Sequence, residues 1–137
     1  KNIFLDIYGE GPEERRLYNL IKNLGLSKQV KLKGFLSEKN KKMFNNYDFS
    51  ICIDFADFRI TSIESINYSC PVIVSNETSI AHADNFKFFY FCEPNVFNLK
   101  DTINSIINSN VNWSNRDIFL KNYLWKNYFN KINEYCL

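Results

Sequence analysis

Charged and hydroxyl side chains cluster between two apolar runs, "FSICI" and "PVIVS", which are typical of buried strands. The cluster contains Asp54, Asp57, Arg59, Thr61, Ser62 and Glu64. At the start of a helix, the backbone amides of Thr61 and Ser62 could bind a phosphate. The Glu64 carboxylate could accept hydrogen bonds from a ribose diol. The alternative is that Glu64 only complements the helix dipole and needs no ligand.

Two other candidate sites follow strand-like runs nearer the N-terminus. Gly9 and Gly11 stand in "YGEGP", where a turn from strand to helix would let the backbone approach a ligand. A tight turn alone explains this short motif equally well. Gly34 and Phe35 end the run "KLKGF", where a flat nucleobase could lie against the aromatic ring. The alternative there is an ordinary turn with a buried Phe35.

Apolar spacing and end signals predict strands that alternate with helices along the whole chain. We expect strands at 2–9, 29–35, 48–54, 71–75 and 86–92, and helices at 12–25, 37–47, 61–69, 95–109 and 115–135. This order favours an α/β fold with a Rossmann-like open sheet of about five mainly parallel strands and helices on both faces. Ligands of such sheets bind outside the carboxyl ends of the strands, where all three candidate sites fall.

Two helices have clear apolar faces in the sequence. The expected face of the first consists of Leu17, Leu20, Ile21 and Leu24, and that of the fourth of Val96, Leu99, Ile103, Ile106 and Ile107. Caps are expected at Ser37 for the second helix and at Thr61 or Ser62 for the third. These faces should pack on the sheet and so hold the candidate residues at its edge.

Size and composition limit the classes of function. The 137 residues suit one domain, 1–137, and contents of 45% hydrophobic and 23% charged residues predict a folded chain. A net charge of +2 is too small to argue for nucleic-acid binding. No apolar run is long enough to cross a bilayer, and we expect a cytoplasmic protein.

The cysteines do not form a metal-binding pattern. They are Cys52, Cys70, Cys92 and Cys136, none is part of a C-x-x-C pair, and the only histidine is His82. Zinc sites need closely paired ligands, so we expect no metal. Reduced cysteines that act as small apolar core residues of a cytosolic protein are the favoured interpretation.

The motifs, taken in order, resemble the C-terminal donor-binding domain of GT-B-fold glycosyltransferases of the large retaining group called family 4 or group 1. The matching segments are "IYGEGPEERRL", "NLGLSKQV", "VKLKGFL", "YDFSICID", "ADFRITSIES", "NYSCPVIVSN", "CEPN" and "LWKNYFNKINEY". They cover nearly the whole chain. The resemblance implies half of a GT-B fold and a hexosyltransferase that uses a UDP- or GDP-linked sugar.

The resemblance also implies roles for the candidate residues. Gly34 and Phe35 would meet the base, and Glu64 would hold the ribose. Thr61 and Ser62 would lie near the diphosphate, as would the turn with Gly9 and Gly11. Asp57 would be the catalytic acid near the sugar, with Arg59 beside it at the rim of the pocket, whereas Asp54 would only anchor the loop. No cofactor or metal is implied, because helix-start amides and a cationic side chain stabilise the leaving diphosphate.

Several positions depart from the family pattern. Counted back from Glu64, the first acid of the family's two-glutamate motif falls at Ala56, and Asp57 is one position away. Ser69 stands where the family usually has glycine. We expect the family's first strand–helix unit, with its diphosphate-binding Arg and Lys, and its acceptor-binding N-terminal domain to precede Lys1 in a longer protein. This segment alone should then be inactive.

Three alternatives remain open at this point. Ala56 favours a degenerate module that binds a nucleotide sugar without transferring it. An epimerase on the same fold would need acid–base residues that mostly lie outside this segment. A phosphoacceptor receiver is suggested by Asp54 at a strand end, but it needs an acidic pair after the first strand, where only Glu10 is close.

For the transferase, the expected partners are a nucleotide sugar and a glycan or lipid-linked acceptor. We also expect the longer parent protein to associate peripherally with the inner face of the membrane.

Overall fold

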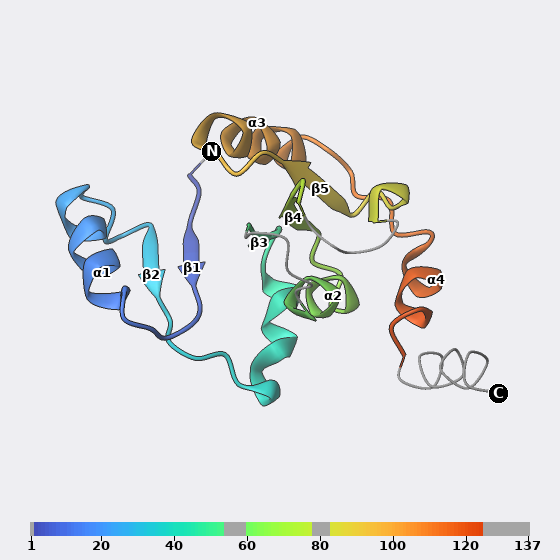
Figure 1. Cartoon of the computed structure of the whole chain (residues 1–137), viewed down its shortest axis with the longest axis horizontal. Coiled ribbons are helices and arrows are strands. Elements are labelled where there is room, and N and C mark those ends of the chain that lie inside the picture. The colour runs from blue at the N-terminus through green and yellow to red at the C-terminus, as the bar shows by residue number, and fades with distance from the viewer. Residues whose placement is uncertain (1, 54–59, 78–82, 125–137) are drawn as a thin grey trace. The chain divides into compact units, whose positions relative to one another are not determined.

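The computed structural model describes residues 2–53, 60–77 and 83–124 (Figure 1). Contacts divide the chain into two compact units, which we call the N-terminal unit (Lys1–Lys41) and the C-terminal unit (Lys42–Leu137). Within the described ranges, no helix is both long enough and apolar enough to cross a membrane.

The N-terminal unit is a strand–helix–strand element. Strands β1 (Leu5–Ile7) and β2 (Val30–Leu32) pair in parallel, with Leu5 opposite Val30 and Ile7 opposite Leu32. Helix α1 (Glu14–Asn23) connects them, as a parallel pair requires. The alternation of strand and helix predicted from the sequence is therefore confirmed here.

Helix α1 buries less of its apolar face than its spacing predicts. Leu17 and Ile21 are half-buried, but Leu20 and Leu24 are exposed, so these two were wrongly assigned to the packed face. The reason is that a two-stranded sheet offers α1 only a narrow surface, and no described residue from 2 to 41 is fully buried. The helix ends at Asn23, and Gly25 just beyond it has a φ of 67°, which is common after a helix C-terminus.

The C-terminal unit contains a second parallel sheet in the order β3–β4–β5 (Figure 1). Its strands are β3 (Ser50–Cys52), β4 (Val72–Ser75) and β5 (Phe89–Cys92). The helices are α2 (Ile60–Asn67), α3 (Val96–Ile107) and α4 (Arg116–Lys121), together with the 3-10 segment η2 (Ala83–Asn85). A further 3-10 segment, η1 (Glu38–Asn46), includes the last residues of the N-terminal unit and the first of the C-terminal unit. With β1 and β2, the described strands number five and all pair in parallel, as the Rossmann-like α/β expectation required.

Side-chain alternation along β4 divides the core into two clusters. Val72 and Val74 face Ile66 of α2 and Phe119 of α4, whereas Ile73 faces Ile106 of α3. Figure 1 accordingly shows α2 and α3 on opposite sides of this sheet. All of β4 is buried because it is the central strand and is covered on both faces.

The α3 face is confirmed except at its first residue. Leu99, Ile103 and Ile107 pack around Ile106 in the second cluster, while Val96 is 79% exposed. Val96 is the first helical residue, next to Asn95, whose side chain accepts a hydrogen bond of 2.9 Å from the amide of Asn98. Val96 thus precedes the residues of α3 that pack against the second cluster.

Two other helix predictions need correction. The short helix predicted at 37–47 is present as the 3-10 helix η1, but Ile60 already belongs to α2, so neither Thr61 nor Ser62 is the N-cap of that helix. The last helix was predicted to run to 135, but α4 ends at Lys121 and is followed by a turn at Asn122 and Tyr123. The remainder of that prediction, 125–135, lies outside the described residues.

We expect Phe119→Ala to lower the free energy of unfolding by about 3–5 kcal/mol. The Phe119 ring is 1% exposed and makes edge contacts with Phe86, Phe88 and Phe89 at centroid distances of 4.9, 5.4 and 5.2 Å. Its neighbour Ile118 is 60% exposed, so Ile118→Ala should change stability by less than about 0.5 kcal/mol. Denaturant unfolding followed by circular dichroism measures both; equal losses would contradict this account of the core.

Candidate functional site

The turns after β1 and β2 meet through a backbone hydrogen bond. The amide of Gly9 donates to the carbonyl of Gly34 over 2.8 Å, and the amide of Lys33 donates to the carbonyl of Ile7 over 2.9 Å. Gly9 has a φ of 128° and Gly34 a φ of 66°, conformations that favour glycine. The glycines singled out from the sequence therefore lie side by side at the carboxyl edge of the β1–β2 pair.

Glu10 fixes the backbone beyond Gly34. Its Oε1 accepts a hydrogen bond of 3.3 Å from the amide of Phe35, and a Cβ at Gly34 would lie 3.6 Å from the same oxygen. The Phe35 ring is 74% exposed, which excludes the alternative of a turn with a buried phenylalanine. An aromatic face is thus presented at this edge, beside backbone groups that are held in place.

Gly11 has a different position from Gly9. Its carbonyl accepts a hydrogen bond of 3.2 Å from the amide of Glu14, the first residue of α1, and its φ is not in the positive range. Nothing lies within 4 Å of a Cβ built on it. Gly11 therefore belongs to the turn that starts α1.

Helix α2 carries the second set of candidates after the carboxyl end of β3. Thr61 is exposed, Glu64 is half-buried, and Ser62 is 1% exposed. Among the described residues, the Ser62 hydroxyl is the buried polar side-chain group that has no hydrogen-bond partner. A buried hydroxyl without a partner costs about 1–3 kcal/mol, so its environment is unusual for a purely structural serine. Asp57 and Arg59 lie outside the described residues.

Buried polar contacts seat α2 on the sheet. Ser65 shares a hydrogen bond of 2.7 Å with Ser50 of β3, and the Ser65 hydroxyl donates to the carbonyl of Cys70 over 2.8 Å. Burial raises the pKa of the Cys70 thiol above its ordinary value of 9.0, so this thiol stays protonated at neutral pH. Cys70 and Cys92 are buried, as the sequence interpretation of core cysteines required, and Cys52 is half-buried.

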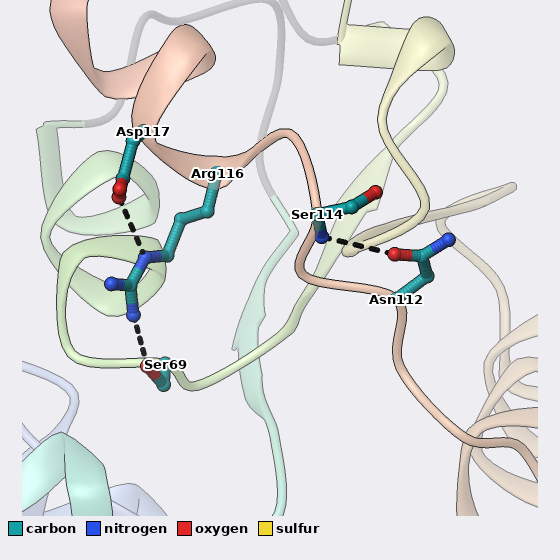
Figure 2. A network of polar contacts seen from close by, with 5 residues as sticks. All are labelled: Ser69, Asn112, Ser114, Arg116 and Asp117. Atoms are coloured by element: carbon teal, nitrogen blue, oxygen red, sulfur yellow. Dashed lines mark hydrogen bonds and ion pairs between the residues drawn. The ribbon is translucent and has the colours of Figure 1, made fainter.

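The far end of α2 is held by a contact that the sequence did not reveal. The Arg116 guanidinium donates to the Ser69 hydroxyl, and its Nε lies 3.4 Å from Oδ1 of Asp117 (Figure 2). Ser69 has a φ of 56°, which explains why glycine is usual at such a position. The serine was noticed in the sequence, but no pattern indicated Arg116. The hydrogen bond from the Phe35 amide to Glu10 was also missed, because the two residues are 25 positions apart and no local pattern links them.

The structure thus groups the candidates into two sets. Gly9, Gly34 and Phe35 meet in the N-terminal unit, and Thr61, Ser62 and Glu64 share α2 in the C-terminal unit. Within the described ranges, no group of three or more His, Cys, Asp or Glu residues could hold a metal ion.

Gly9→Ala should destabilise the protein by roughly 1–3 kcal/mol, because alanine is strained at a φ of 128°. Gly11→Ala is the matched control: it lacks a positive φ and has open space around its Cβ, so we expect almost no change. Thermal unfolding measured side by side checks the pair. A Gly11→Ala loss as large as that of Gly9→Ala would show that the positive φ is not the cause.

Comparison with known proteins identifies the family. Residues 1–122 match the family model described as glycosyl transferases group 1. The search of curated proteins gave no match. The matched range contains both sets of candidate residues and all five described strands. Because the match covers most of the 137 residues, the chain belongs to the group 1 glycosyltransferase family.

Proposed function

We propose that the protein binds a UDP- or GDP-linked sugar and transfers a hexosyl group, with retention, to a glycan or lipid-linked acceptor. The observation that carries the proposal is the position of α2, which follows the carboxyl end of the half-buried parallel strand β3 and bears Thr61, Ser62 and Glu64. That edge is where open α/β sheets bind ligands. Membership of the group 1 family supports the reaction class.

Each residue has a role in this proposal. The exposed ring of Phe35 stacks against the base, next to the backbone of Gly34, which Gly9 and Glu10 hold in place. Glu64 accepts hydrogen bonds from the ribose hydroxyls. The amides of Thr61 and Ser62, close to the start of α2, bind the diphosphate, because helix N-termini favour anions.

Asp57 is the proposed catalytic carboxylate, and Arg59 the cation nearest the diphosphate. Departure of a nucleoside diphosphate places negative charge on the leaving group, which helix-start amides and a guanidinium stabilise electrostatically. The reaction would then need no bound metal. Cytoplasmic nucleotide sugars would place it in the cytoplasm, and a lipid-linked acceptor would bring the protein to the inner face of the membrane.

A second candidate function is binding of a nucleotide sugar without transfer. Ala56 favours it, because this residue stands at the position of the first acid in the pattern that the sequence resembles. The two functions differ only in turnover. Both require the nucleotide to bind near Glu64, so binding and transfer have to be measured separately.

The ribose role predicts that Glu64→Ala weakens binding of uridine or guanosine diphosphate by about tenfold to a hundredfold. The reason is the loss of one hydrogen bond to a carboxylate, at about 1.5–3 kcal/mol. Isothermal titration calorimetry of the full-length protein measures the affinity. Asp101→Ala removes an exposed carboxylate from α3 and should leave it unchanged. Equal affinities in the wild type and Glu64→Ala would refute the ribose role.

The catalytic role predicts that Asp57→Asn lowers the transfer rate of the full-length protein by about a hundredfold or more, with little change in melting temperature. Asp54→Asn is the control, because Asp54 anchors the loop in this proposal and does not touch the ligand. Release of nucleoside diphosphate, measured with acceptor present, gives the rate. Nucleotide binding without any wild-type transfer would favour the non-catalytic module; wild-type rates in Asp57→Asn would leave Glu64 as the only acid of the site.

A further inference from the structure

We propose that Arg116 and Ser69 are positioning residues, which hold the C-terminal turn of α2 so that Glu64 is kept in the geometry that binds the donor. The inference rests on the proposed function of α2 and adds residues that do not touch the ligand. It begins from a contact between segments that are 47 residues apart in the sequence.

The contact joins the end of α2 to the start of α4. Figure 2 shows the Arg116 side chain lying between Ser69 and Asp117, with one guanidinium nitrogen directed at the serine hydroxyl. The Arg116 side chain is 32% exposed and that of Asp117 is 81% exposed. The pair with Asp117 is weak, because its Nε–Oδ1 distance of 3.4 Å is long for a charge-assisted hydrogen bond and the carboxylate is exposed to water.

Ser69 occupies the position that ends α2. The amide of Ser69 donates to the carbonyl of Ile66 and that of Cys70 to the carbonyl of Ser65, each over 3.0 Å. This pair of bonds around a residue of positive φ is a Schellman motif, in which glycine is the usual residue. A serine there is strained by its Cβ, and the Arg116 hydrogen bond offsets that strain.

The same turn includes Glu64. The described part of α2 has eight residues, and the carbonyl of Glu64 accepts a hydrogen bond of 3.2 Å from the amide of Tyr68. The backbone of Glu64 is therefore part of the turn that Ser69 terminates. Fraying of that turn would release the segment that carries the carboxylate.

Arg116 is well placed to act as a fixed support. The indole of Trp113 stacks on Phe88 with a centroid distance of 5.5 Å and an interplanar angle of 10°, and Phe119 is buried in the same cluster. The amide of Arg116 donates to the carbonyl of Trp113 over 3.0 Å, and the Asn112 side chain accepts a hydrogen bond of 2.9 Å from the amide of Ser114 (Figure 2). The arginine thus extends from a backbone that is anchored in the core on both sides.

The first test is amide hydrogen exchange measured by NMR. Arg116→Ala should reduce protection of the amides of Tyr68, Ser69 and Cys70 by about tenfold, while β4 amides keep theirs. Adding Ser69→Gly should restore protection, because glycine adopts a positive φ without help from an arginine. Arg16→Ala is the matched control, since Arg16 forms a surface ion pair with Glu13 at 2.7 Å and its side chain is 82% exposed. Unchanged protection in Arg116→Ala would overturn the proposal.

The second test is the affinity for uridine and guanosine diphosphate by calorimetry. Arg116→Ala should weaken binding by roughly threefold to tenfold, and the double variant with Ser69→Gly should recover the wild-type value. Loss of protection without loss of affinity would overturn the positioning role, as would a double variant that regains protection but not affinity. If the wild type binds neither nucleotide, the proposed function itself fails, and the exchange data still show separately whether Arg116 holds the turn.

Discussion

Burial of β4 from both sides is the constraint on which the rest of the C-terminal unit depends. Val72 and Val74 are covered by α2 and α4, and Ile73 by α3, so one short strand has to be matched by apolar faces on three helices. Helix α4 has only six residues, and it covers this strand through the buried ring of Phe119. Two polar residues of α2, Ser62 and Ser65, are buried in this packing, and Ser65 is hydrogen-bonded to Ser50 and to the Cys70 carbonyl.

The candidate site follows from this arrangement. Because β3, β4 and β5 are parallel, each connection from strand to helix starts at the same edge, and α2, the helix that follows β3, bears Thr61, Ser62 and Glu64. The polar network of Ser50, Ser65 and the Cys70 carbonyl fixes α2 where apolar packing alone would leave it free to slide. Arg116 secures its other end.

The N-terminal unit depends on different forces. It has no fully buried residue in its described part, and a two-stranded sheet is marginally stable by itself. Backbone hydrogen bonds between its turns, above all the one from Gly9 to Gly34, therefore account for a larger share of its local order. The same bonds place Phe35 with an open aromatic face, so local stability and a candidate binding surface arise from one set of contacts.

The sequence by itself determined the α/β class, the order of the elements, the burial of β4 and most of the α3 face, because these follow from the spacing of apolar residues along the chain. It also located Gly9, Gly34 and the α2 residues at strand ends, although it wrongly made Thr61 or Ser62 a cap and extended α4 beyond Lys121. Only the tertiary structure decided that Leu20, Leu24 and Val96 stay exposed, that Glu10 binds the amide of Phe35, and that Arg116 binds Ser69. The physical reason is that periodicity describes only which face of an element is apolar. How much of that face is covered depends on how the elements pack. The same packing decides which polar groups, far apart in the sequence, become hydrogen-bond partners.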